Sequence, residues 1–84
     1  MSETILITGG FGYIGRHTCI NLLLDGYNVV IVDSKKIEVL EEINNQIFKV
    51  TGKKAILNSL RISSKEDFRI IFNNFNIDVV IHFA

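Results

Sequence analysis

Several features that would indicate a partner or a compartment are missing from this sequence of 84 residues. Nine basic and nine acidic residues leave no net charge, so there is no electrostatic argument for binding nucleic acid or an anionic membrane surface. No run of about twenty apolar residues occurs, and we therefore expect no transmembrane helix. The first residues carry no basic region, and glycines interrupt the apolar stretch that follows, so a signal peptide is not expected either.

Cysteine is also scarce. Cys19 is the single cysteine, so no internal disulfide can form, and the cytoplasm is the expected compartment. No cysteine, histidine and carboxylate residues have the spacing of a metal site, and we expect no metal ion. A chain this short buries only about 60–65 % of the surface that its unfolded form exposes. Residues 1–84 are therefore expected to form one small domain, too small for a complete α/β enzyme.

Short apolar runs alternate with segments of helical period along the whole chain. The runs predict strands, and the segments with apolar residues every three or four positions predict helices. The predicted strands are residues 4–8, 29–32, 55–57 and 78–83, and the predicted helices are 13–24, 36–51 and one that begins at Ser63 or Ser64. Strands joined by single helices form right-handed crossovers in a parallel sheet. We predict an α/β, Rossmann-like βαβαβαβ fold with strand order 3-2-1-4.

The turn between the first strand and the first helix carries three evenly spaced glycines, Gly9, Gly12 and Gly15. A pyrophosphate can approach the backbone only where Cβ atoms are missing, and at a helix N-terminus it meets unpaired N–H groups. Glycine also serves tight turns that bind nothing. Asp33, eighteen residues beyond Gly15, favours the nucleotide interpretation, because its carboxylate could accept hydrogen bonds from ribose hydroxyls.

Asp33 also bears on the choice of cofactor. A carboxylate at this position repels a 2′-phosphate, which favours NAD over NADP. Lys35 and Lys36 keep the alternative open, because either could reach a 2′-phosphate, although solvated lysines are common at the start of a helix. NAD is therefore the predicted cofactor.

Residues 8–19 (TGGFGYIGRHTC) resemble the N-terminal signature of the UDP-glucose 4-epimerase family of extended short-chain dehydrogenases/reductases, and residues 80–84 (VIHFA) resemble its fourth strand. The resemblance covers the whole chain but only the N-terminal segment of a family member. It implies interconversion of UDP-glucose and UDP-galactose with tightly held NAD. It places the pyrophosphate at Gly9, Gly12, Tyr13 and Ile14, the ribose at Asp33, and the nicotinamide at Phe83 and Ala84. The other predicted cofactor-binding residues are Gly15, which lets the helix and the strand pack closely, Ser34 and Ile62.

The catalytic Tyr-x-x-x-Lys pattern of that family is absent, since Tyr13 is followed four positions later by His17. We assign no catalytic residue and expect the isolated chain to be inactive, with a UDP-sugar bound only by the rest of such an enzyme. The alternatives are a non-catalytic nucleotide-binding module or decayed remnant, and the N-terminal part of a related NAD-dependent sugar-nucleotide dehydratase.

Two positions depart from the family's pattern. Ser34 stands where an asparagine commonly follows the acid, and Arg61 stands where an aspartate would accept from the adenine amino group, although arginine can only donate. His17 and His82 are expected to be packed structural histidines. The last strand would form a sheet edge, and its unpaired apolar edge predicts self-association with another chain.

Overall fold

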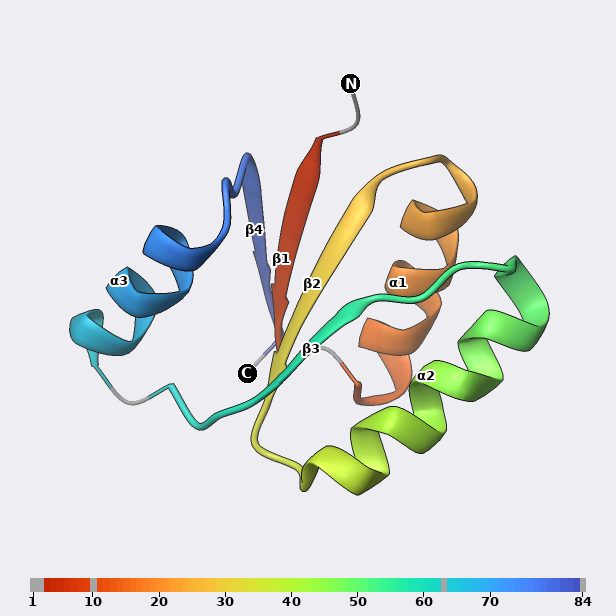
Figure 1. Cartoon of the computed structure of the whole chain (residues 1–84), viewed down its shortest axis with the longest axis horizontal. Helices are drawn as coiled ribbons and strands as arrows, with labels where there is room; N and C mark the ends of the chain where they lie inside the picture. The colour runs from red at the N-terminus through yellow and green to blue at the C-terminus, as the bar shows by residue number, and fades with distance from the viewer. Residues whose placement is uncertain (1–2, 10, 63, 84) are drawn as a thin grey trace.

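The computed structural model describes residues 3–9, 11–62 and 64–83. Within these ranges all four strands pair in parallel, in the order β3-β2-β1-β4, which confirms the predicted fold class and strand order. Helices α1 and α2 cover one face of the sheet and α3 covers the other (Figure 1). The elements are β1 (Thr4–Thr8), α1 (Tyr13–Leu24), β2 (Asn28–Asp33), α2 (Ile37–Thr51), β3 (Ile56–Ser59), α3 (Lys65–Asn74) and β4 (Val79–His82).

The core has two sides because successive side chains of a strand point to opposite faces of the sheet. In β1, Ile5 and Ile7 pack in the cluster that includes Leu40 of α2, whereas Leu6 packs in the cluster that includes Ile71 of α3. Both faces of β1 and β2 are therefore buried. This explains why their sequences are continuous apolar runs rather than alternating ones.

The helix ends follow local chemistry that the sequence displays. Helix α2 ends at Gly52, whose φ of 73° lies in the left-handed region that glycine adopts readily. Helix α3 begins after Ser64, whose hydroxyl accepts a hydrogen bond from the Asp67 N–H at 3.4 Å. Ser63, the other predicted start, lies outside the described residues.

The third strand is displaced from its predicted position, since it runs from Ile56 to Ser59 instead of covering residues 55–57. Asn44 of α2 provides the reason. Its amide nitrogen donates to the Ala55 carbonyl, and its amide oxygen accepts from the Ala55 N–H, both at 3.0 Å. Because a side chain occupies both backbone groups of Ala55, this residue cannot take part in the ladder of the sheet.

Helix α1 packs through a narrower face than its apolar residues suggested. Tyr13 and Ile14, two of the apolar residues whose helical spacing predicts this helix, are 78 % and 64 % exposed. The buried positions are instead Gly15, Cys19 and Leu23, each four residues from the next, which places them in one row along the helix. The exposed pair lies at the N-terminal end of α1, beside the glycine turn.

Neither histidine is packed, contrary to expectation, and both are exposed. The His17 ring lies on the outer side of α1 and meets the Tyr13 ring edge-on, with 4.8 Å between the centroids. His82 ends β4, and within the described residues this strand has only β1 as a neighbour. Its Nδ1 atom is hydrogen-bonded to Oγ1 of Thr8, the residue opposite it in β1.

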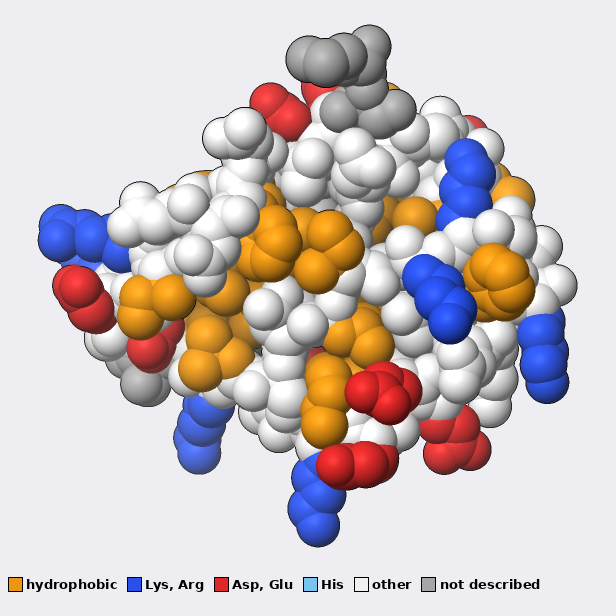
Figure 2. Space-filling view, viewed as in Figure 1, with side chains coloured by type: hydrophobic (Ala, Val, Ile, Leu, Met, Phe, Trp, Pro, Cys, Tyr) orange, Lys and Arg blue, Asp and Glu red, His pale blue; other side chains and the backbone are white. Residues whose placement is uncertain are grey.

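The face of the molecule in Figure 2 carries basic and acidic side chains in alternation, while hydrophobic side chains gather over α3 and β4. The exposed hydrophobic residues of these two elements are Ile70, Phe72, Val79 and Val80. Among the described helices, none combines the length and apolar character needed to span a membrane.

Candidate functional site

A cavity of about 230 Å³ opens at the carboxyl ends of the strands, between the ends of β1, β2 and β4 and the segment that follows β3. Ligands of open parallel sheets bind at this edge, at the point where successive connections leave toward opposite faces. Here that point lies between β1 and β4, because the chain proceeds from β1 to β2 and β3 on one side and returns to the other side of β1 with β4. The residues that line the cavity are Thr8, Gly9, Val32, Asp33, Ser34, Leu60, Arg61, Ile62 and His82.

Two glycines of the turn beside this cavity differ in backbone conformation. Gly9 has a φ of 63°, which strains any residue with a side chain, and its N–H donates to the Val32 carbonyl at 2.8 Å. Gly12 has an ordinary φ of −71°. A Cβ atom built on Gly12 would meet only the Gly9 carbonyl oxygen, at 4.0 Å. The protein itself therefore leaves room for a side chain at position 12, so packing does not explain this glycine.

The N-terminus of α1 is suited to an anion. Gly12 is its N-cap residue and offers no side-chain hydrogen bond, and no acidic residue lies in the first turn. The first N–H groups of a helix lack partners within the helix, and its dipole is positive at that end. By contrast, α2 and α3 both carry acidic residues in their first turns. A pyrophosphate therefore fits the glycine turn sterically and electrostatically.

Asp33, at the end of β2, is the charged group around which the site is organised. Its side chain is 6 % exposed. Its Oδ2 atom accepts a hydrogen bond from the Phe11 N–H at 3.1 Å, and its Oδ1 atom accepts one from the Lys35 N–H at 2.9 Å. The carboxylate thus joins the glycine turn to the loop after β2. The Lys35 ammonium is a second donor to Oδ2, at 3.5 Å, so a lone pair remains on Oδ1 for a further donor, such as a ribose hydroxyl.

Burial by itself would raise the pKa of Asp33, but the N–H groups of Lys35 and Phe11 and the Lys35 ammonium outweigh it, so the pKa lies below its ordinary value. A carboxyl group with a lowered folded pKa stabilises the fold above its unfolded pKa of about 4 and loses that contribution as the pH falls through the folded pKa. We expect urea unfolding at about pH 6 and about pH 3 to show a smaller loss of stability in Asp33→Asn than in the native chain. Equal losses would contradict this role.

Other predicted site residues lie around the cavity without lining it. Tyr13 and Ile14 are exposed at the start of α1, and Gly15 is buried against the sheet. Phe83 is half-buried against the core on the α1 and α2 side, and its N–H donates to the Thr8 carbonyl at 2.9 Å. Ala84 lies outside the described residues.

Five residues that line the cavity were not predicted as site residues: Val32, Leu60, Arg61, Thr8 and His82. Thr8 and His82 are polar residues that end apolar strands, and the order 3-2-1-4 makes those strands neighbours, so the contact between these two residues could have been inferred. Lys35 was considered only for its charge. Its ammonium lies 3.5 Å from Asp33 Oδ2, and its side chain is 40 % exposed. Lys36, in contrast, is the exposed N-cap residue of α2.

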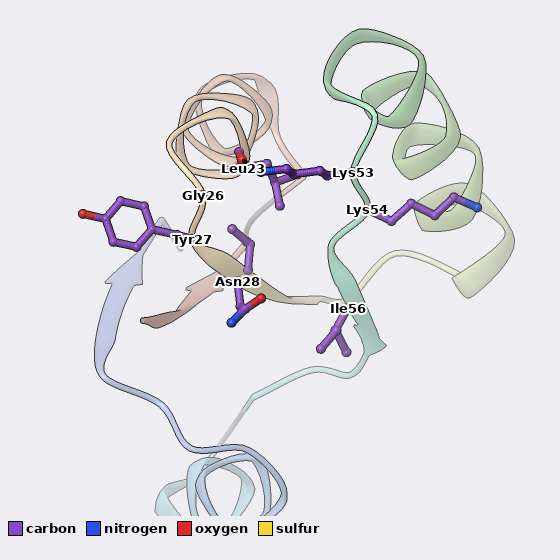
Figure 3. Close-up of a pocket in the computed structure, with 8 residues that line it drawn as sticks. Leu23, Gly26, Tyr27, Asn28, Lys53, Lys54 and Ile56 are labelled. Atoms are coloured by element: carbon purple, nitrogen blue, oxygen red, sulfur yellow. Dashed lines mark hydrogen bonds between the residues drawn. The ribbon is translucent and has the colours of Figure 1, made fainter. Parts of the chain in front are cut away.

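A larger hollow of about 460 Å³ lies at the opposite edge of the sheet, near the amino ends of β2 and β3. Figure 3 shows Lys53 reaching toward Leu23, while Lys54 extends away from it. The Lys53 ammonium donates to the Leu23 carbonyl at 3.1 Å, and the Lys54 ammonium lies 5.3 Å from the centre of the Phe48 ring. Lys53 thus stabilises the end of α1, and Lys54 packs on the surface of α2. These contacts explain the positions of both ammonium groups, so no ligand needs to be inferred here.

Reactive groups are scarce elsewhere. Burial raises the pKa of the Cys19 thiol to about 12, so the thiolate required for nucleophilic chemistry does not form near neutral pH. Among the residues that the structure describes, no three histidine, cysteine or carboxylate side chains are grouped to hold a metal ion.

Comparison with known proteins adds to this geometry. The sequence model of the NAD dependent epimerase/dehydratase family matches residues 5–84. A UDP-glucose 4-epimerase of Schizosaccharomyces pombe is 47 % identical over 81 residues, which cover 96 % of this chain and 22 % of that protein.

Two crystal structures of UDP-glucose 4-epimerases are similar to the fold. The enzyme from Stenotrophomonas maltophila, with bound NAD and formylated UDP-arabinopyranose, has a TM-score of 0.84 and 33 % identity. The enzyme from Bifidobacterium longum, in complex with NAD+ and UDP, has a TM-score of 0.82 and 36 % identity. Each match covers 98 % of this chain and 24 % of the other. The chain therefore spans about a quarter of the length of these relatives.

Proposed function

Because this chain belongs to the NAD dependent epimerase/dehydratase family, we propose that it supplies the NAD-binding segment of an enzyme that interconverts UDP-glucose and UDP-galactose. The carrying observation is the carboxyl-end cavity. A buried carboxylate and Gly9 of the glycine turn line it, and the turn leads to a helix N-terminus without a side-chain cap at the same edge of the sheet. The names of the relatives supply the sugar nucleotide in this proposal.

In the proposed complex, different parts of the cofactor meet different elements. Gly9, Gly12 and the first turn of α1 hold the pyrophosphate, with Tyr13 and Ile14 against it. Asp33 accepts hydrogen bonds from the adenosine ribose. The remaining contacts are the adenine at Ser34 and Ile62 and the nicotinamide at Phe83 and Ala84.

When bound, NAD accepts a hydride from the sugar and returns it. The chain's own contribution is to bind and orient the dinucleotide, because no Tyr-x-x-x-Lys pattern occurs in its sequence. We therefore propose that these 84 residues bind NAD without epimerising UDP-galactose. A second candidate is a nucleotide-binding module that takes part in no sugar chemistry, and it is favoured by Arg61, which lines the cavity where the resemblance would place an aspartate.

Isothermal titration of the chain with NAD tests the proposed binding. We expect saturable, one-to-one binding with a Kd below about 1 mM, which corresponds to about 4 kcal/mol. Incubation with UDP-galactose and NAD should yield no UDP-glucose. Absence of saturable binding would refute both candidates, whereas turnover would show that the Tyr-x-x-x-Lys residues are dispensable.

The proposed compartment is the cytoplasm. The lone, buried Cys19 supports this, because a free cysteine is typical of a reducing compartment.

We also propose self-association through the edge of β4. The exposed Val79 and Val80 on this strand support that proposal, since unpaired apolar edges accept further strands. Light scattering that gives a monomer at high concentration would contradict it.

A further inference from the structure

Lys35 lies beside the Asp33 carboxylate and makes contacts through its N–H, its carbonyl and its ammonium group. Its N–H donates to Asp33 Oδ1 at 2.9 Å, and its carbonyl accepts from the Ser59 hydroxyl at 2.5 Å. The ammonium then lies 3.5 Å from Asp33 Oδ2. These backbone contacts fix the Cα atom of Lys35 beside Asp33, so the ammonium on its flexible side chain stays within reach of the carboxylate. The negative charge that should repel a 2′-phosphate thus has a cation beside it.

A second cation lines the same cavity from the segment that follows β3. Arg61 lines the cavity together with Asp33 and Ser34. The residue before it, Leu60, donates its N–H to the Asp33 carbonyl at 2.9 Å, so the segment after β3 lies directly alongside the end of β2. Arg61 is exposed and forms no ion pair with the residues that the structure describes. Its guanidinium is therefore available to an anion in the cavity.

The charged side chains around Asp33 bear on whether the site accepts a ribose with a free 2′-hydroxyl or one with a 2′-phosphate. The cavity region holds one carboxylate, Asp33, and two cations, Lys35 and Arg61, so these three side chains carry a formal net charge of plus one. His82 is the remaining titratable group on the cavity wall. Guanidinium and ammonium groups form strong, charge-assisted hydrogen bonds to phosphate oxygens. An arginine near the ribose acid is also the feature that accommodates a 2′-phosphate in this type of fold.

We propose that Lys35 and Arg61 make the ribose end of the cavity accept a 2′-phosphate, so that the chain binds NADP as well as NAD. This inference rests on the proposed function, because it assumes that the adenosine ribose lies at Asp33. It modifies the expectation that Asp33 alone would exclude NADP: the carboxylate holds the ribose hydroxyls, and the two cations hold the additional phosphate.

Parallel titrations with NAD and NADP, at one ionic strength, test this specificity. The variants are Lys35→Met, Arg61→Met and the double variant. Lys49→Met serves as the matched control, because it removes the same charge in the last turn of α2, at the other edge of the sheet. We expect native Kd values for NADP and NAD within about tenfold of each other, and the double variant should raise the ratio of the two at least about tenfold. Lys49→Met should leave the ratio unchanged.

The outcomes separate the inference from the function on which it rests. If the chain binds NAD but not NADP, or if the double variant weakens both nucleotides equally, the inference is wrong and the proposed function stands. Equal weakening is the result expected if Lys35 serves only to hold Asp33 in place. If neither nucleotide binds saturably, the proposed function fails, and the inference fails with it.

Discussion

Replacing Gly12 by alanine is expected to weaken NAD binding at least about tenfold, and replacing it by valine to abolish binding, while the chain stays folded. The backbone at Gly12 has ordinary angles, and an added Cβ meets only the Gly9 carbonyl oxygen, at 4.0 Å. The fold therefore tolerates the methyl group at a cost of about 1 kcal/mol, the usual penalty of alanine at an N-cap. A pyrophosphate seated on the same backbone has no such room.

The control is Gly52→Ala at the end of α2. Nothing lies within 4 Å of a Cβ built there, but the φ of 73° strains a residue with a side chain. This variant should lose about 1–2 kcal/mol of stability and keep its NAD affinity. Calorimetric Kd values and urea unfolding are measured on both variants: both should lose stability, but only the Gly12 variant should lose NAD affinity if Gly12 faces the cofactor. Unchanged NAD affinity in Gly12→Val would show that the pyrophosphate lies elsewhere.

Asp33→Asn is the second change with a large expected effect, and it should affect both affinity and stability. The carboxylate accepts hydrogen bonds from two backbone N–H groups and lies beside the Lys35 ammonium. An asparagine has one acceptor oxygen, so its amide nitrogen must face one of those N–H donors. A buried donor without a partner costs about 1–3 kcal/mol. We expect unfolding free energy to fall by about 2 kcal/mol and NAD affinity to fall at least about tenfold.

A matched aspartate lies at the opposite edge of the sheet. Asp78 also accepts a backbone N–H, that of Thr4 at 2.8 Å, but the contact is exposed to solvent. Asp78→Asn should therefore change the Kd for NAD by less than about twofold and lower stability by less than about 1 kcal/mol. Affinities are measured well below both melting temperatures, so that unfolding does not enter the Kd. Equal NAD affinities in Asp33→Asn and Asp78→Asn would show that Asp33 does not contact the cofactor.

Much of this fold could be predicted because its signals are local. The apolar runs around Leu6 and Val30 are long enough to identify buried strands, and Gly52 and Ser64 mark helix ends through their own backbone and side-chain chemistry. The order of the strands followed from the doubly wound arrangement that alternating strands and helices favour. Asp33 could be placed in the cavity because it ends a strand at the edge where such sheets bind ligands.

The features that escaped prediction depend on contacts between residues far apart in the sequence. The start of β3 is set by Asn44, which lies eleven residues before Ala55 and occupies its backbone groups. The pairing of Lys35 with Asp33 depends on the path of the loop, which Ser59 holds from a neighbouring strand. The spacing of apolar residues also suggested that Tyr13 packs in the core, but its side chain is exposed beside the glycine turn.

The central claim is that NAD binds at the carboxyl ends of the strands, and amide chemical shifts measured by NMR during an NAD titration test it most directly. We predict saturable shifts in the N–H signals of Phe11, Tyr13 and Lys35, because these groups surround the proposed pyrophosphate and ribose positions. The signals of Gly26 and Lys54, at the hollow on the opposite edge, should stay in place. Shifts confined to Gly26 and Lys54 would contradict the claim.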